Sequence, residues 1–131
     1  PNNPFVLVAT PKGQKAELGC LVNACLAVST GWNPVYLGTD LSSRDICEAA
    51  KNSSCSAVIM SILFPLNDPT VPLELERIRN GLGGEFEIII NGKRSSIYSK
   101  TCSKIGSHQI YDLFSLPNAL EDIRTDVLRK I

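Results

Sequence analysis

Short apolar runs alternate with stretches of helical periodicity along the whole chain, and this alternation constrains the fold most. The run at residues 57–61 (Ala-Val-Ile-Met-Ser) is apolar at nearly every position, which is typical of a strand buried on both faces. Strands that alternate with helices form a parallel sheet, because each helix returns the chain to the same edge. The sequence therefore predicts an α/β domain with a flavodoxin-like, doubly wound, five-stranded parallel sheet and helices on both faces.

The expected elements follow from apolar spacing and from capping residues. Strands are expected at residues 5–10, 35–37, 57–61, 85–90 and 109–111, with the first strand central. Helices are expected at residues 14–30, from Ser42 or Ser43 to about 52, 71–82, 95–105 and from Pro117 onward. Ligands of such sheets bind beyond the carboxyl ends of the strands, so the functional loops are expected at residues 10–16, 38–41, 61–70, 91–95 and 112–116.

Charge and termini limit the partners that the chain can bind. Basic and acidic residues both number 13, so we expect no direct binding to nucleic acid by this domain. No apolar run reaches about 18 residues, so we expect no membrane contact and a cytoplasmic location. Met60 is the only methionine, and Pro1 is expected to be a cut end. Residues 1–4 then end a linker, and residues 5–131 form the domain.

The cysteines and the one histidine do not form a recognisable metal or redox site. Five cysteines lack CxxC spacing, and we expect them to be small buried thiols: Cys20, Cys25, Cys47, Cys55 and Cys102. His108 precedes the expected fifth strand, so it is expected at the amino end of the sheet, away from any ligand. No metal ligand is predicted.

Several functions known for this architecture are excluded because the sequence lacks the residues that they require. A phosphorylation receiver needs acidic residues where this chain has Ala9-Thr10 and Met60-Ser61. A flavodoxin needs a phosphate-binding loop after the first strand, but Pro11 removes an amide donor there and the loop has one glycine. Neither a G-x-G-x-x-G turn nor a Ser/His/Asp triad falls at the strand ends. We therefore predict no catalytic residue and no enzymatic activity.

Three spaced motifs carry a resemblance to a known family. The loop after the first strand reads Gly-Gln-Lys-Ala-Glu-Leu-Gly over 13–19, and the second strand reads Tyr-Leu-Gly over 36–38. Gly19 is followed by 41 residues and Ser-Ile-Leu at 61–63, and then by 27 residues and Asn91-Gly92. This frame resembles the cobalamin-binding domains, most closely those fused to MerR-type transcription regulators of the CarH kind.

The departures from that frame concern the metal ligand and the cofactor tail. Ala16 stands where the family has its cobalt-ligating histidine, and Gln14 stands at the acidic position. Asn91 replaces the first glycine of a Gly-Gly pair. The resemblance then implies cobalamin bound base-on, without histidine ligation, or haem in its place, or no cofactor.

The resemblance also implies a set of cofactor-binding residues. Ser61 and Leu63 would line the slot for dimethylbenzimidazole, with Gly92 beside it, while Gly19 would allow close helix packing. An open crevice is expected between the 61–66 and 91–95 loops, lined by Thr10, Gln14, Ser61, Leu63, Asn91 and Gly92. In the alternative, Gln14, Asn91 and larger neighbours fill this crevice.

Three functions remain open at this point. The first is a ligand-sensing module of a transcription regulator, fused to a DNA-binding domain and able to form a homo-oligomer. The second is a degenerate domain that binds no cofactor and docks partners through Phe64-Pro65-Leu66 and the last helix. The third, and least favoured, is a corrinoid carrier domain of a methyltransferase or mutase, whose cobalt chemistry depends on the histidine.

Overall fold

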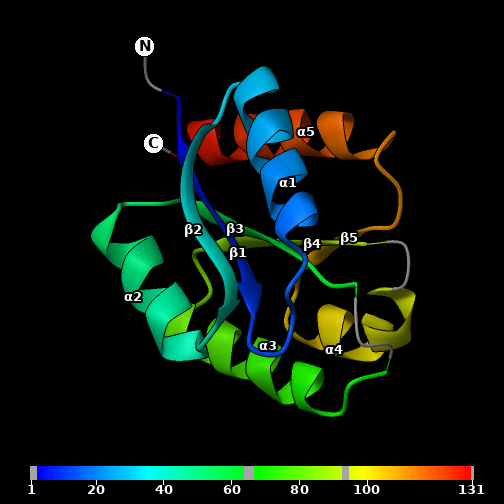
Figure 1. Cartoon of the computed structure of the whole chain (residues 1–131). Coiled ribbons are helices and arrows are strands. Elements are labelled where there is room, and N and C mark those ends of the chain that lie inside the picture. Colours follow the sequence, from blue (N-terminus) through cyan, green and yellow to red (C-terminus); the bar gives the residue numbers. More distant parts are fainter. Residues whose placement is uncertain (1–2, 64–66, 93–94, 131) are drawn as a thin grey trace.

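A five-stranded, all-parallel sheet with order β2-β1-β3-β4-β5 forms the centre of the computed structural model, which describes residues 3–63, 67–92 and 95–130 (Figure 1). The strands are β1 (Phe5–Pro11), β2 (Asn33–Leu41), β3 (Ala57–Ser61), β4 (Glu87–Asn91) and β5 (His108–Ile110). The helices are α1 (Glu17–Ser29), α2 (Ser43–Asn52), α3 (Thr70–Leu82), α4 (Ser99–Lys104) and α5 (Leu116–Arg129), with a 3-10 turn η1 at Ser95–Tyr98. The predicted flavodoxin-like α/β architecture is confirmed.

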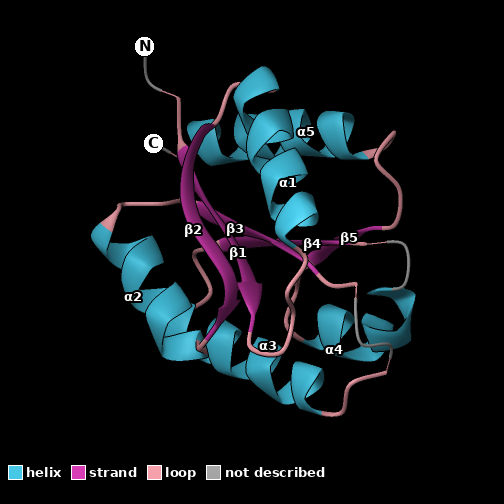
Figure 2. Cartoon of the chain, viewed as in Figure 1, coloured by secondary structure: helices cyan, strands magenta, loops and turns pink. Residues whose placement is uncertain are grey.

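Helices cover both faces of the sheet, with α1 and α5 on one face and α2, α3 and α4 on the other (Figure 2). Alternate strand residues enter the two cores, so Val6 and Val8 face α1 and α5 while Leu7 faces the opposite layer. All five residues of β3 are buried. The continuous apolar run at 57–61 thus reflects a strand with a helical layer on each side.

Several predicted boundaries differ from those observed. The first strand is an interior strand between β2 and β3, but β3 occupies the middle of the sheet. The second strand is longer than expected and includes Pro34, which an edge strand tolerates because one side of its backbone needs no ladder partner. His108 begins β5 instead of preceding it, and its Nε2 lies 2.7 Å from Glu87 Oε2. Its predicted place at the amino end of the sheet is correct.

The buried face of α1 is not the stripe of large apolar residues that indicated the helix. Cys20, Asn23 and Ala27 face the sheet, whereas Leu18 is 74% exposed and Leu21 is 52% exposed. Small residues let α1 lie close to the strands, and larger side chains remain outside. Cys25 is also exposed, so the expectation of five buried thiols holds for four of them.

The last helix packs on its own domain. Its apolar residues Leu116, Leu120, Ile123 and Val127 are all buried in the core under α1 and α5. The Trp32 indole N–H adds a hydrogen bond of 3.0 Å to the Leu120 carbonyl. The expectation that this helix offers an apolar docking surface is therefore wrong, since amphipathic periodicity alone does not say which partner covers the stripe. No helix among the described residues is both long and apolar enough to cross a membrane.

Candidate functional site

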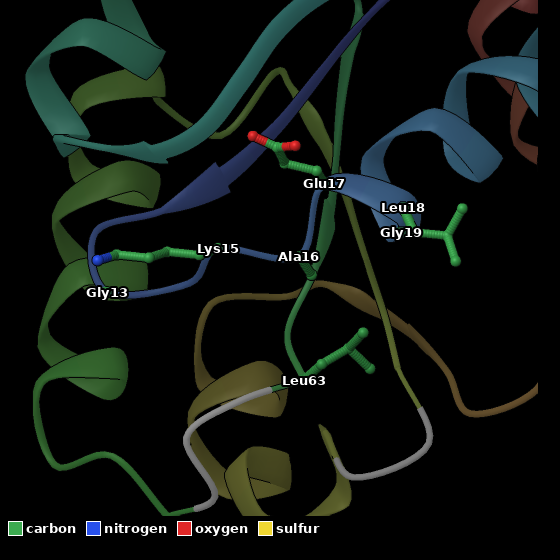
Figure 3. Close-up of a pocket in the computed structure, with 7 residues that line it drawn as sticks. All are labelled: Gly13, Lys15, Ala16, Glu17, Leu18, Gly19 and Leu63. Carbon is green, nitrogen blue, oxygen red and sulfur yellow. The ribbon is translucent and has the colours of Figure 1, made fainter.

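Two adjoining hollows lie at the carboxyl edge of the sheet, where the loops after β1, β3, β4 and β5 meet. The first, called the Ala16 hollow, has a volume of about 730 Å³ and is lined by Gly13, Lys15, Ala16, Glu17, Leu18, Gly19 and Leu63 (Figure 3). The second, called the apolar groove, has a volume of about 570 Å³ and is lined by Leu18, Gly19, Val22, Asn23, Ser61, Leu63, Asn91, Gly92, Ile110, Tyr111, Asp112, Leu113 and Phe114. Leu18, Gly19 and Leu63 border both, so the two hollows adjoin one another.

A bulge in β2 holds the loop under the Ala16 hollow. The pairing of β1 with β2 shifts after Val8, and Gly38 and Asp40 take positive φ angles of 123° and 57° there. This geometry lets the Asp40 carboxylate accept a hydrogen bond of 2.7 Å from the Gly13 amide. The Asp40 amide in turn donates to the Gln14 carbonyl at 2.9 Å. The Tyr-Leu-Gly motif therefore marks a bulge that fixes the loop.

Gln14 joins this loop to the end of β3. Its Oε1 accepts a hydrogen bond of 2.8 Å from the Leu63 amide, and the whole side chain is buried. Its Nε2 has no hydrogen-bond partner among the described residues. Thr10 is also buried, with its hydroxyl donating to the Gln14 carbonyl. Neither residue lines either of the two hollows. The Thr10 hydroxyl and Gln14 Oε1 hold the loop instead, and the cofactor-binding role expected for Thr10 and Gln14 stays a prediction.

Among the described residues that line the Ala16 hollow, no side chain is placed to ligate a metal. Ala16 lines it with a methyl group, and the Lys15 and Glu17 side chains extend away from Leu63 (Figure 3). Cys20 lies one helical turn away but is buried, and burial raises the pKa of its thiol to about 11, with a smaller contribution from Glu17. Within residues 3–63, 67–92 and 95–130, no group of three or more His, Cys, Asp or Glu could hold a metal ion.

Three polar side chains form the floor of the apolar groove. Asn23 Nδ2 donates to Ser61 Oγ at 2.9 Å, Ser61 Oγ donates to Asn91 Oδ1 at 2.8 Å, and Asn91 Nδ2 donates to Asn23 Oδ1 at 2.6 Å. Asn23 is fully buried, and Ser61 and Asn91 are 3% and 4% exposed. We call this closed set the Asn–Ser–Asn triad. Sequence reasoning singled out Ser61 and Asn91 but missed Asn23, whose only signal is an amide within an otherwise apolar helix.

Two glycines let backbone and helix approach the groove closely. A Cβ at Gly19 would stand 2.9 Å from Ser61 Oγ, so this glycine lets α1 pack against the end of β3. Gly92 has a φ of 130°, and a Cβ there would collide with the Ile62 carbonyl oxygen. Close helix packing, which the sequence suggested for Gly19, is what the structure shows.

Large apolar side chains form the walls and rim of the groove. Val22 lies on the α1 side and Ile110 on the β5 side, while Phe114 stands at the rim and is 95% exposed. The loop after β5 was expected to be functional, but these rim residues were not singled out. Phe64-Pro65-Leu66, the segment named for docking, lies outside the described residues.

Comparison with solved structures identifies proteins that share the fold of this chain. No protein-family model matches the chain, and a search of curated proteins returns no match. A novel cobalamin-binding protein from Desulfitobacterium hafniense DCB-2 is similar in structure, with a TM-score of 0.72, 16% identity and coverage of 99% of this chain and 60% of that one. The chain therefore has the fold seen in a cobalamin-binding protein.

Two structures from Methanosarcina barkeri show the same fold. The monomethylamine corrinoid protein has a TM-score of 0.72 at 14% identity, over 91% of this chain and 57% of that one. The methanol:cobalamin methyltransferase complex MtaBC gives a chain with a TM-score of 0.77 at 16% identity, over 99% of this chain and 52% of that one. In each of these three comparisons, this chain spans 60% or less of the other protein.

Proposed function

We propose that this chain is a corrinoid-binding domain that holds cobalamin without a protein ligand to cobalt and acts as the ligand-sensing part of a regulator. The observation that carries the proposal is the apolar groove at the carboxyl edge, next to the Ala16 hollow. The fold shared with the cobalamin-binding protein from Desulfitobacterium hafniense supports a corrinoid as the ligand.

The residues present fit the tail of a corrinoid and do not fit histidine ligation. Gly19 and Gly92 leave backbone close to the groove, where a Cβ would meet Ser61 or Ile62. Val22, Leu63 and Ile110 offer apolar walls for a flat ring system. At the other hollow Ala16 has no donor atom, so any lower ligand to cobalt must be water, the cofactor's own base or a group from another chain.

We place the lower base in the apolar groove, which corresponds to base-off binding. The groove is lined mainly by aliphatic and aromatic side chains, whereas the Ala16 hollow is bordered by Lys15 and Glu17. A ring that lies between apolar walls loses more contact with water than a ring that lies beside charged residues, so the groove is the more favourable place for it. Base-on binding, which the sequence led us to expect, is the alternative, and the absorption spectrum of the bound cofactor distinguishes the two.

The regulatory role is supported by what the Ala16 hollow lacks. In the family the histidine controls the reactivity of cobalt, and a domain without it is suited to sense a cofactor instead of cycling it. In this proposal the domain is fused to a DNA-binding domain and changes its assembly, including homo-oligomer formation, when ligand is bound. The broad exposed rim that Leu18, Leu113 and Phe114 give the groove is the surface a ligand would cover first.

Titration of the purified chain tests the proposal. We expect methylcobalamin, hydroxocobalamin and cobinamide to bind at micromolar concentration, with methylcobalamin showing a base-off absorption spectrum, while haem binds more weakly. Gel filtration with and without ligand reads out assembly. If the folded chain binds no corrinoid and no haem, the proposal fails.

A corrinoid carrier function is the second candidate, and the fold shared with the corrinoid protein and the MtaBC complex favours it. It differs from sensing in the chemistry that it requires. A carrier should accept a methyl group from methyl iodide after reduction of its bound cobalamin, and release it to a thiol faster than free cobalamin does. A sensor should show no such acceleration.

A further inference from the structure

The hydrogen bonding of the Asn–Ser–Asn triad determines what the apolar groove can offer a ligand. Ser61 was expected to line the slot for dimethylbenzimidazole, and its hydroxyl is a group that could give such a ligand a polar contact. Its single O–H is 2.8 Å from Asn91 Oδ1, and its oxygen accepts from Asn23 Nδ2 at 2.9 Å. A hydroxyl has one proton to donate, so this proton is already used inside the protein.

The Ser61 proton is held inside the triad whichever way the two carboxamides are oriented. If oxygen and nitrogen were exchanged in both Asn23 and Asn91, Ser61 would accept from Asn91 and donate to Asn23. In both arrangements Ser61 donates one hydrogen bond and accepts another within the triad. The triad is also shielded, since no member is more than 4% exposed. An incoming ring nitrogen therefore meets a floor without a free hydroxyl proton.

Asn91 is the residue that closes the triad. Its side chain contacts both other members, through Oδ1 to Ser61 and through Nδ2 to Asn23. In the arrangement that the structure shows, Asn91 Oδ1 is the acceptor of the Ser61 proton. A glycine at this position would remove that acceptor, and the Ser61 proton would then be free to point into the groove. Asn91 also lies directly before Gly92, where the backbone approaches Ile62, and both residues line the groove.

We propose that Asn91 is a specificity-determining residue: by holding the Ser61 proton inside the triad, it makes the groove hold a lower base without a hydrogen bond from the Ser61 hydroxyl. This rests on the proposed corrinoid function and names the class of ligand. The groove accepts corrinoids whose lower base has no ring nitrogen, such as phenolyl cobamides, as well as benzimidazole cobamides.

Three corrinoids with different tails test this assignment: cobalamin, a phenolyl cobamide and cobinamide, which has no base. The ratio of the dissociation constants of cobalamin and the phenolyl cobamide is the readout. Cobalamin must break its own cobalt–nitrogen bond to enter the groove, but that cost is the same for every variant and cancels when the ratios are compared. Fold is checked for each variant by urea unfolding.

Two substitutions carry the prediction. Ser61→Ala should leave the ratio unchanged within about twofold, because the Ser61 proton never reaches the base. Asn91→Gly should favour cobalamin over the phenolyl cobamide by about fivefold to tenfold, because the freed hydroxyl then binds the ring nitrogen. Adding Ser61→Ala to Asn91→Gly should remove this gain. Asn52→Gly, at an exposed position at the end of α2, is the matched control and should change nothing.

The outcomes separate this inference from the proposed function. If Ser61→Ala alone weakens cobalamin about tenfold relative to the phenolyl cobamide, the serine donates to the base and the assignment of Asn91 is wrong, while corrinoid binding stands. If the Asn91→Gly protein is not folded, the Ser61→Ala result decides the question by itself. If the folded wild-type chain binds none of the three corrinoids, both the function and this inference fail.

Discussion

The two hollows at the carboxyl edge differ in what their neighbours do with polar groups. Around the Ala16 hollow, the polar groups of Thr10, Gln14 and Asp40 fix a loop in which residue 16 lines the space with a methyl group. In the apolar groove, the three side chains of the triad hydrogen-bond to one another beneath mainly apolar walls. Under the proposed function, the difference means that affinity would come from burial of the corrinoid tail, because among the described residues no side chain of the Ala16 hollow is placed to bind the metal.

The largest effect is expected from Gly92→Ala, which disturbs the backbone that lines the apolar groove. The new Cβ would collide with the Ile62 carbonyl, and the φ of 130° is unfavourable for any residue with a side chain. We expect a loss of about 3 kcal/mol in the free energy of unfolding, measured in urea. Gly84→Ala, where a Cβ meets nothing within 4 Å, is the control. Equal stability of the two variants would contradict the close approach at Gly92.

A smaller loss is expected when the triad loses the residue that sequence reasoning missed. Asn23→Leu keeps the branched shape of the side chain but leaves Asn91 Nδ2 without its acceptor and removes the donor to Ser61. Leaving buried polar groups unpaired should cost about 2 kcal/mol of unfolding free energy. Asn52→Leu on the exposed end of α2 should cost almost nothing. Equal free energies of unfolding for the two leucine variants would contradict a stabilising role of the triad.

Filling the groove should weaken cobalamin binding without unfolding the chain. Val22→Trp places an indole against the groove from α1, and we expect cobalamin to bind at least about tenfold more weakly. Cobinamide, which has no base to accommodate, should lose less than about twofold. Val28 lies on the same helix and is 62% exposed, so Val28→Trp serves as the control. Equal loss for both corrinoids would place the tail outside the groove.

Restoring a ligand should make the Ala16 hollow contribute to binding. Ala16→His places an imidazole where the side chain now has no donor atom, and we expect about fivefold tighter cobalamin binding with a histidine-ligated spectrum. The gain should be present above the ordinary imidazole pKa of about 6.5 and disappear below it, because only the neutral ring binds metal. Lys12→His, an exposed position in the same loop, is the control. An unchanged spectrum at all pH values would mean that cobalt does not lie above residue 16.

The sequence predicted the fold well because its strongest signals are repeated and local. The apolar run at 57–61 and the regular alternation of elements predict the parallel sheet. The 41-residue spacing between Gly19 and Ser61 also has a direct physical counterpart, since a Cβ at Gly19 would touch Ser61. The length of β2 was less predictable, because an edge strand containing Pro34 and a bulge carries a weak periodic signal.

The candidate site was only partly predictable, because side-chain partners depend on distant elements. Gln14 was expected to line the crevice, yet its Oε1 binds the Leu63 amide 49 residues away in the chain. Asn23 was overlooked because helical spacing highlights Leu18 and Leu21, which the structure leaves exposed. The apolar periodicity of the sequence does not predict that α1 packs on the sheet through its small residues.

By itself, the sequence determined the order of strands and helices, the absence of a donor atom at Ala16, and the spacing of Gly19, Ser61 and Asn91. These properties follow from residue identity and local periodicity, which need no knowledge of distant contacts. Only the tertiary structure decided that Asn23, Ser61 and Asn91 close one hydrogen-bonded triad under an open apolar groove. The physical reason is that hydrogen bonds between α1, β3 and β4 exist only after packing fixes the helix on the sheet, and this packing also decides which polar groups remain for a ligand.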